Sequence, residues 1–148
     1  AGRAGRAKED LGRVIVQTFS PDAPPIRHAA KHDFEGFAEE ELALRAAVGL
    51  PPVGRMARVV VRDADLAKAT AAAKEIAAAL RQVAPKEVLL RGPMPCALSR
   101  IADMHRLAIE AMAPSAAPIQ SMLTAVRNVG LLKSDSRTAV DVDPIALL

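Results

Sequence analysis

Arg55-Met56-Ala57-Arg58-Val59-Val60-Val61-Arg62 is the stretch of sequence that decides the fold. Three consecutive valines stand at its centre with polar residues around them, a pattern typical of a β-strand. Asp63 follows directly and can cap an alanine-rich helix, which we expect over residues 64–83. Residues 87–91 then predict a second short strand, closed by Gly92-Pro93. Strand, helix and strand in this order form one βαβ-like half of a domain.

A second half of similar length follows after an irregular connector. The apolar run over residues 105–112 predicts a third strand, although Leu107-Ala108-Ile109 could equally belong to a helix. Residues 114–130 predict a second helix, and residues 138–142 a last strand ended by Asp143-Pro144. The order β-α-β-β-α-β predicts an α+β domain of the split βαβ, ferredoxin-like kind, with two helices on one face of a four-stranded sheet.

The residues before this domain predict different elements. Residues 13–19 are β-branched and apolar enough for a buried strand, and the turn-forming residues 20–25 end it. Residues 26–48 have a helical pattern, in which Phe34 and Phe37 are expected to pack this segment against the part of the protein before it or against the C-terminal domain. Gly49 is a plausible helix C-cap and Pro51-Pro52 prevents continuation. We therefore place the main boundary after residue 52.

The composition excludes several classes of protein. A chain of 148 residues holds one modest domain with a core and an appendage, and no run approaches the roughly 18 apolar residues of a membrane span. The single cysteine, Cys96, excludes an internal disulfide framework and a multi-thiolate zinc site, and fits a reducing cytoplasm. The net charge is +3 and Trp and Tyr are absent, so DNA contact would need a local basic patch without aromatic stacking.

The segment Gly2-Arg3-Ala4-Gly5-Arg6 contains two arginines three residues apart, and each directly follows a glycine. Small residues allow a partner to approach the backbone closely, and guanidinium groups match phosphate geometry. Taken alone, the pentapeptide is better interpreted as a solvated basic turn. Its position before the apolar residues 13–19 makes this interpretation less favoured.

The sequence has neither a G-x-x-x-x-G-K-[ST] loop nor an Asp-Glu-x-His box. Residues 49–56 come nearest to the loop, but Arg55 replaces its lysine and Met56 its hydroxyl residue. Pro51 and Pro52 also remove two N–H donors from the phosphate cradle. We expect that this chain alone does not hydrolyse ATP.

Two resemblances connect these features. The Gly2–Arg6 segment resembles the last motif of superfamily 2 helicases, and the rest of the chain resembles the C-terminal part of the bacterial primosomal replication-restart helicases. The second resemblance covers the chain in order and rests on these residues: His32-Asp33-Phe34-Glu35-Gly36-Phe37 with Glu41-Leu42 and Arg45; Gly49-Leu50-Pro51-Pro52; Gly92-Pro93-Met94-Pro95 with Leu98, Arg100 and Arg106; and Val140-Asp141-Val142-Asp143-Pro144 with Leu147-Leu148. Each motif is loose, but their shared order is specific.

The resemblance implies that the whole protein is an ATP-dependent 3′–5′ DNA helicase. It would recognise stalled or abandoned replication forks and begin primosome assembly in replication restart, as a monomer in the bacterial cytoplasm, at forks of the nucleoid. Residues 1–25 would end the second RecA-like lobe, residues 26–52 would form a helical connector, and residues 53–148 would form the fork-binding domain, similar to a ribosomal small-subunit protein fold. Partners would be forked and single-stranded DNA, single-stranded-DNA-binding protein and other primosome proteins. ATP and Mg²⁺ would be bound mainly, and zinc entirely, by parts outside this chain.

By the same resemblance, Arg3 and Arg6 would sense the γ-phosphate of ATP, with Arg6 as the arginine finger and Gly2 and Gly5 as backbone of the ATP cleft. A preorganised arginine stabilises charge that develops on the transferring phosphoryl oxygens. Residues 1–7 therefore form the candidate catalytic segment.

Arg91, Arg100 and Arg106 are expected to bracket the connector between the second and third strands. Prolines and a glycine in residues 92–95 would stiffen this connector, and fixed arginines suit phosphate contacts that position a protein without reading sequence. With His105 they are the candidate DNA-binding residues. They could equally be solvated charges that discourage pairing at a sheet edge.

Three positions depart from the family pattern. His105 stands where the family usually has Tyr, Met112 where Lys is common, and Val53 where Phe often follows the prolines. Loss of a stacking ring and a charge would weaken DNA contact at the third strand.

The remaining polar residues have simpler interpretations. His28, His32 and His105 have no thiolate partner, so no metal site is expected. Asp33 is a credible N-cap for the helix that carries Phe37. Asp141 and Asp143 are either solvent-facing or fix the chain end through hydrogen bonds to a nearby arginine. The alternative to the helicase hypothesis is a non-catalytic ferredoxin-like module that binds RNA or a protein.

Overall fold

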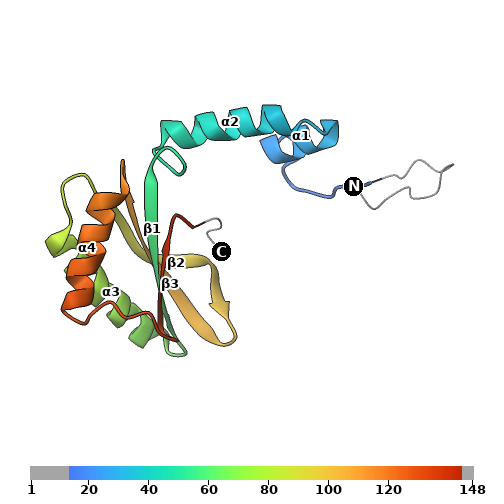
Figure 1. The fold of residues 1–148 in the computed structure, drawn as a ribbon. Helices are drawn as coiled ribbons and strands as arrows, with labels where there is room; N and C mark the ends of the chain where they lie inside the picture. Colours follow the sequence, from blue (N-terminus) through green and yellow to red (C-terminus); the bar gives the residue numbers. More distant parts are fainter. Residues whose placement is uncertain (1–13, 145–148) are drawn as a thin grey trace. The chain divides into compact units, whose positions relative to one another are not determined.

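The computed structural model describes residues 14–144, which contain four helices and four strands (Figure 1). The chain divides into two compact units, of which the first ends at Glu41 and the second begins at Leu42. Within residues 14–144, no helix has both the length and the apolarity that crossing a bilayer requires.

Helix α1 (Pro24–Lys31) and helix α2 (Phe34–Ala47) replace the single helical segment predicted over residues 26–48. The break lies at His32, which adopts a left-handed conformation with φ 55° and ends α1. Asp33 serves both helices, because its N–H donates to the carbonyl of His28 and its carboxylate accepts from the N–H of Gly36 at 2.9 Å. The predicted N-cap role of Asp33 is therefore confirmed.

One prediction for the first unit is wrong. Residues 14–19 form no strand and are exposed, because no strand within the described residues pairs with them and an isolated strand leaves its backbone groups unpaired. Phe34 is 76% exposed in this chain, while Phe37 is half-buried beside the ring of His28, and the packing of both against another part of the protein stays a prediction. Residues 14–23 thus show no edge of a RecA-like lobe, and residues 1–13 lie outside the described residues.

The end of α2 has the predicted glycine cap. Gly49 has φ +68°, its N–H donates to the carbonyl of Ala46, and the N–H of Leu50 donates to the carbonyl of Arg45. This pair of bonds satisfies carbonyls that the helix itself leaves unpaired.

The second unit has the predicted β-α-β-β-α-β order. Its elements are strand β1 (Arg55–Asp63), helix α3 (Leu66–Val83), strands β2 (Leu89–Ile101) and β3 (Met104–Ala113), helix α4 (Ala116–Asn128) and strand β4 (Thr138–Val142). The strands form one sheet in the order β2-β3-β1-β4, and every neighbouring pair is antiparallel. Strand β3 is therefore inserted between β1 and β2, which run parallel to each other, so the third apolar run is a strand and not a helix.

Strand β2 is much longer than predicted. Gly92-Pro93 does not close it, and the expected connector is part of the strand up to Ile101. The register against β3 shifts twice, between Arg91 and Met94 and again between Pro95 and Arg100. Gly92 marks the first shift with φ +93°, and a Cβ there would lie 2.5 Å from the carbonyl oxygen of Ala108. Gly92 and Pro93 therefore lie in a β-bulge within the strand and not in a turn that ends it.

The core lies between the sheet and helices α3 and α4, which cover one face of the sheet (Figure 1). Strand β1 contributes Ala57, Val59 and Val61 to this core. Asp65 caps α3, since its carboxylate accepts from two N–H groups of the first turn. The prediction of Asp63 as the cap is wrong by two residues, because Asp63 still belongs to β1.

A smaller cluster lies on the other, helix-free face. Val60 and Ala108 are cross-strand partners there, and Cys96 packs with them as a buried free thiol. Cys96 therefore packs here as a small apolar residue.

Candidate nucleic-acid interface

The candidate catalytic segment lies outside the described residues. Gly2, Arg3, Gly5 and Arg6 all precede residue 14, where the described part of the chain begins. Their role in ATP sensing stays a prediction.

Residues 49–56, the nearest match to a nucleotide-binding loop, contain a tight hydrogen-bonded turn. The N–H of Gly54 donates to the carbonyl of Leu50 at 3.1 Å, and Pro51 and Pro52 have no N–H. A Cβ on Gly54 would lie 2.0 Å from the carbonyl oxygen of Gly49, so no space remains between these backbone segments. This turn does not fit a nucleotide phosphate.

The four candidate DNA-binding residues all lie on the β2–β3 hairpin, but on two faces. Arg91 pairs in register with Glu110, and Arg106 with Arg62 of β1. The alternation of side chains along a strand places Arg91 and Arg106 on the helix-free face.

Arg100 and His105 are partners of each other, and His105 also pairs in register with Asp63. Because His105 neighbours Arg106 on one strand, this second pair points toward the opposite face. The hairpin therefore presents one arginine to each side near its far end, rather than a single stiff basic loop.

These residues differ in accessibility and partners. Arg91 is exposed. The side chain of Arg100 is 59% exposed and its Nη2 lies 3.1 Å from Oδ1 of Asp103, an exposed pair of small energetic weight. Arg106 is half-buried, and its Nη1 donates to the carbonyl of Leu98 at 3.3 Å, inside the second bulge. Arg106 thus also supports the shape of β2.

A cross-strand row of alternating charge crosses the whole helix-free face. It runs through Arg91, Glu110, Arg58 and Asp141, one residue from each strand. Arg58 is buried, with Nε 3.9 Å from Oε1 of the similarly enclosed Glu110. The acidic members compensate the arginines in this row.

Sequence reasoning missed Arg58 and Arg62 as site residues. Met56, Arg58, Val60 and Arg62 alternate along β1 with the apolar core residues, so period-two alternation was the available signal. It places both arginines on the face opposite the helices.

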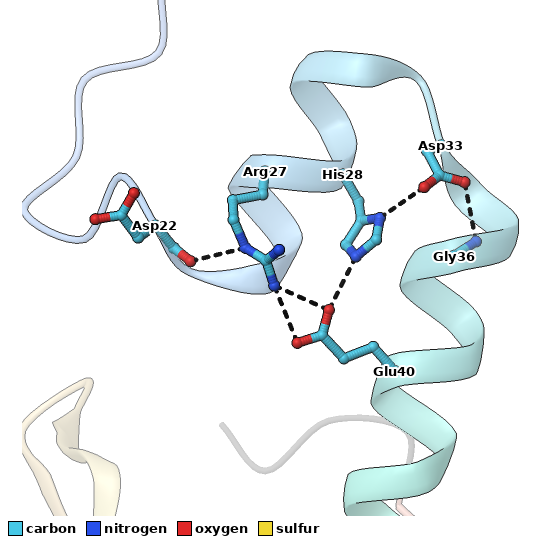
Figure 2. A network of polar contacts seen from close by, with 6 residues as sticks. All are labelled: Asp22, Arg27, His28, Asp33, Gly36 and Glu40. Atoms are coloured by element: carbon cyan, nitrogen blue, oxygen red, sulfur yellow. Dashed lines mark hydrogen bonds and ion pairs between the residues drawn. The ribbon is translucent and has the colours of Figure 1, made fainter.

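The first unit contains a separate network of charges at the α1–α2 junction (Figure 2). His28 Nδ1 lies 2.9 Å from Oδ2 of Asp33, and its Nε2 lies 2.9 Å from Oε2 of Glu40. Arg27 donates from Nη2 to both Glu40 oxygens, at 3.0 and 2.9 Å, and from Nε to the carbonyl of Asp22. The network joins one turn of α1 to two turns of α2.

The two carboxylates favour the charged imidazolium of His28. The hydrogen bond to Glu40, followed by the one to Asp33, raises the pKa of His28 above 6.5. The N–H of Gly36 and then His28 lower the pKa of Asp33, and His28 lowers the pKa of Glu40. Only a doubly protonated ring donates to both carboxylates at once. The helix N-cap position singled out Asp33 before the structure was known, whereas no local pattern singled out His28 or Glu40.

A shallow pocket of about 490 Å³ lies beside this network. Its lining is mostly apolar and consists of Pro25, His28, Ala29, His32, Asp33, Phe34 and Phe37. Among residues 14–144, no group of three or more His, Cys, Asp or Glu side chains could hold a metal ion.

A family profile described as "Primosomal protein N C-terminal domain" matches residues 46–145. The chain belongs to the primosomal protein N family. The resemblance inferred from the sequence motifs is therefore confirmed, and the matched residues include the whole β1–β4 domain.

The chain is similar to curated proteins named "Replication restart protein PriA". It is 31% identical to that of Synechocystis sp. over 147 residues, 34% identical to that of Treponema pallidum over 148 residues, and 36% identical to that of Bacillus subtilis over 106 residues. These alignments cover 99%, 100% and 72% of this chain but 17%, 22% and 13% of the relatives. The chain thus spans about a fifth or less of the length of these relatives.

Proposed function

We propose that this chain is the C-terminal part of an ATP-dependent 3′–5′ DNA helicase for replication restart, and that its β1–β4 domain holds forked DNA. Membership of the primosomal protein N family supports the first statement, since relatives that match the full chain are named replication restart proteins. Primosome proteins, including single-stranded-DNA-binding protein, would be its partners, and it would act as a monomer in the bacterial cytoplasm at forks.

The observation that carries the DNA-binding proposal is the β2–β3 hairpin with its exposed Arg91 and Arg100. Arginines on regular strands are held more precisely than on a loop, and they match phosphate oxygens without reading bases. The hairpin has no Phe, Tyr or Trp side chain and only the ring of His105, so its contacts would be mainly electrostatic.

ATP hydrolysis would belong to the whole protein. Arg3 and Arg6 would reach the γ-phosphate of ATP from the N-terminal segment, with Gly2 and Gly5 beside the cleft. ATP with Mg²⁺ would be bound mainly, and zinc entirely, by parts outside this chain.

The test is fluorescence anisotropy of this chain with a synthetic fork, a duplex and a single strand of equal length, across a salt series. We expect a preference for the fork that falls with salt, because released counterions drive phosphate contacts. The double variant Arg91→Ala/Arg100→Ala should weaken fork binding at least tenfold, whereas Lys74→Ala with Arg127→Ala, which removes two exposed charges from α3 and α4, should leave it within twofold.

Equal or undetectable binding to all three DNAs would contradict the proposal. The domain would then serve as a protein-docking or RNA-binding module, and fork recognition would lie elsewhere in the protein.

A further inference from the structure

A pocket of about 360 Å³ lies between the far end of the β2–β3 hairpin, the end of β1 and the segment before β4. Its lining residues are Arg62, Ile101, Ala102, Met104, Arg106 and Ser136. Two arginines and no acidic side chain line it, so the pocket is cationic.

The two arginines are direct cross-strand partners. Arg62 of β1 lies opposite Arg106 of β3 in the register of the sheet. Like charges in this arrangement destabilise a sheet, because the side chains of opposed residues approach closely. An anion between the two guanidinium groups would remove this repulsion.

Arg62 is poorly compensated by the protein. Its Nε is buried without a hydrogen-bond partner, and its side chain forms no ion pair with any residue in 14–144. A partly desolvated guanidinium in this state interacts more strongly with an anion than one in bulk water does.

The neighbouring acidic side chains have other partners. Asp63 lies 3.7 Å from Arg137 and accepts from the N–H of Asp65, while Asp103 pairs with Arg100. Asp135 accepts from the N–H groups of residues 137 and 138, which lower its pKa. None of the three lines the pocket.

The rest of the lining suits a sugar-phosphate chain. Ile101 and Met104 form apolar walls that match a deoxyribose, and the Ser136 hydroxyl can donate to a phosphate oxygen. The pocket has no ring for a base to stack on, so it would bind backbone and not sequence.

We propose that this pocket binds one backbone phosphate of the DNA, between Arg62 and Arg106. The inference rests on the proposed function, because it names a contact through which the domain holds DNA. Arg106 has a second task in supporting the Leu98 bulge, so Arg62 is the residue to test.

The experiment compares Arg62→Gln with Arg127→Gln in this chain, by fork, duplex and single-strand anisotropy across a salt series. Arg127 is an exposed arginine near the end of α4, on the helical layer. We expect Arg62→Gln to weaken binding of all three DNAs about five- to twentyfold and to reduce the slope of log K against log salt by about 1, as loss of one phosphate contact does. Arg127→Gln should change neither.

Thermal unfolding without DNA separates binding from folding. Arg62→Gln should leave the melting temperature unchanged or raise it, because it removes one of two opposed charges. A lower melting temperature together with weaker binding would assign Arg62 a structural role and overturn the proposal.

A free phosphate ion could bind this pocket through the same contacts as a DNA backbone phosphate. Inorganic phosphate is titrated at constant ionic strength, with chloride as the control, while amide shifts of Ser136 and Met104 are followed by NMR. Shifts with phosphate but unchanged DNA binding in Arg62→Gln would overturn the DNA assignment. If the unchanged chain binds no DNA at all, the proposed function fails; if it binds and only Arg62→Gln is without effect, the pocket proposal alone fails.

Discussion

Asp143 and Arg55 hold the end of β4 against the start of β1. Oδ2 of Asp143 lies 2.7 Å from Nη2 of Arg55, and its Oδ1 accepts from the N–H of Met56 at 3.0 Å. The N–H of Asp143 also donates to the carbonyl of Met56 at 2.7 Å. Of the two interpretations of the Val-Asp-Val-Asp-Pro segment, fixation of the chain end is thus confirmed for Asp143, whereas Asp141 is exposed.

Replacement of Asp143 should therefore destabilise the domain. Asp143→Ala should lower the free energy of unfolding by about 1–2 kcal/mol, since it removes an ion pair and a hydrogen bond to a charged acceptor. Asp143→Asn keeps an acceptor oxygen and should lose less than half of that. Urea unfolding followed by circular dichroism measures both, with Asp141→Ala as the control on the same strand. Equal effects at positions 141 and 143 would contradict the assignment.

The charge network around His28 should make the stability of the α1–α2 junction depend on pH. The folded-state pKa of His28 lies above its ordinary 6.5, so its stabilisation is fully present below about pH 6.5 and is lost as the pH rises through the folded value. The folded-state pKa values of Asp33 and Glu40 lie below their ordinary 3.8 and 4.5, so their stabilisation is lost as the pH falls through those folded values. The junction should be most stable between about pH 4.5 and 6.5.

NMR titration of the His28 ring protons measures this directly. Glu40→Gln should lower the pKa of His28 more than Asp33→Asn does, because the bond to Glu40 is the largest cause of the shift. Glu39→Gln is the matched control, since Glu39 is exposed and takes no part in the hydrogen bonds of the network. A pKa of His28 at or below 6.5 in the unchanged chain would show that the network does not form.

The fold was predictable wherever short-range signals agree. Alternation in β1, a capped alanine-rich helix and proline- or glycine-bounded segments are all local, and they identified the element order of the second unit. The prediction that Gly92-Pro93 ends the second strand was wrong. Its turn signal is local, whereas its place in a bulge depends on the approach of Ala108 from another strand. The strand predicted over residues 13–19 failed for the same reason, since a strand also needs a partner strand to pair with.

The candidate site was less predictable than the fold. Arg62 and Arg106 meet only through the register of β1 against β3, which no local pattern specifies. The sequence singled out Arg106 through a motif and passed over Arg62. Arg100 and His105 were grouped with Arg91 and Arg106 because they are close in sequence, yet strand alternation separates the two pairs.

The tip of the β2–β3 hairpin offers a stabilising substitution. Ala102 and Asp103 form a two-residue turn with φ 48° and 62°, a left-handed conformation that costs an alanine about 1 kcal/mol. Ala102→Gly should raise the free energy of unfolding by about 0.5–1 kcal/mol. The same substitution at exposed Ala78, in the interior of α3, should lower it by about 1 kcal/mol. The two variants of identical chemistry should therefore shift the urea midpoint in opposite directions, and equal signs would contradict the turn assignment.

The alanines of α3 set how closely this helix approaches the rest of the core. Ala69, Ala73 and Ala77 recur every four residues on one face and are at most 1% exposed. A larger side chain has no room there, so Ala73→Leu should cost about 1–3 kcal/mol of unfolding free energy through overpacking. Ala71→Leu, on the exposed face of the same helix, should stay within about 0.5 kcal/mol. Thermal unfolding of the two variants checks this, and a tolerated leucine at position 73 would mean that the helix can move away from the sheet without loss of packing.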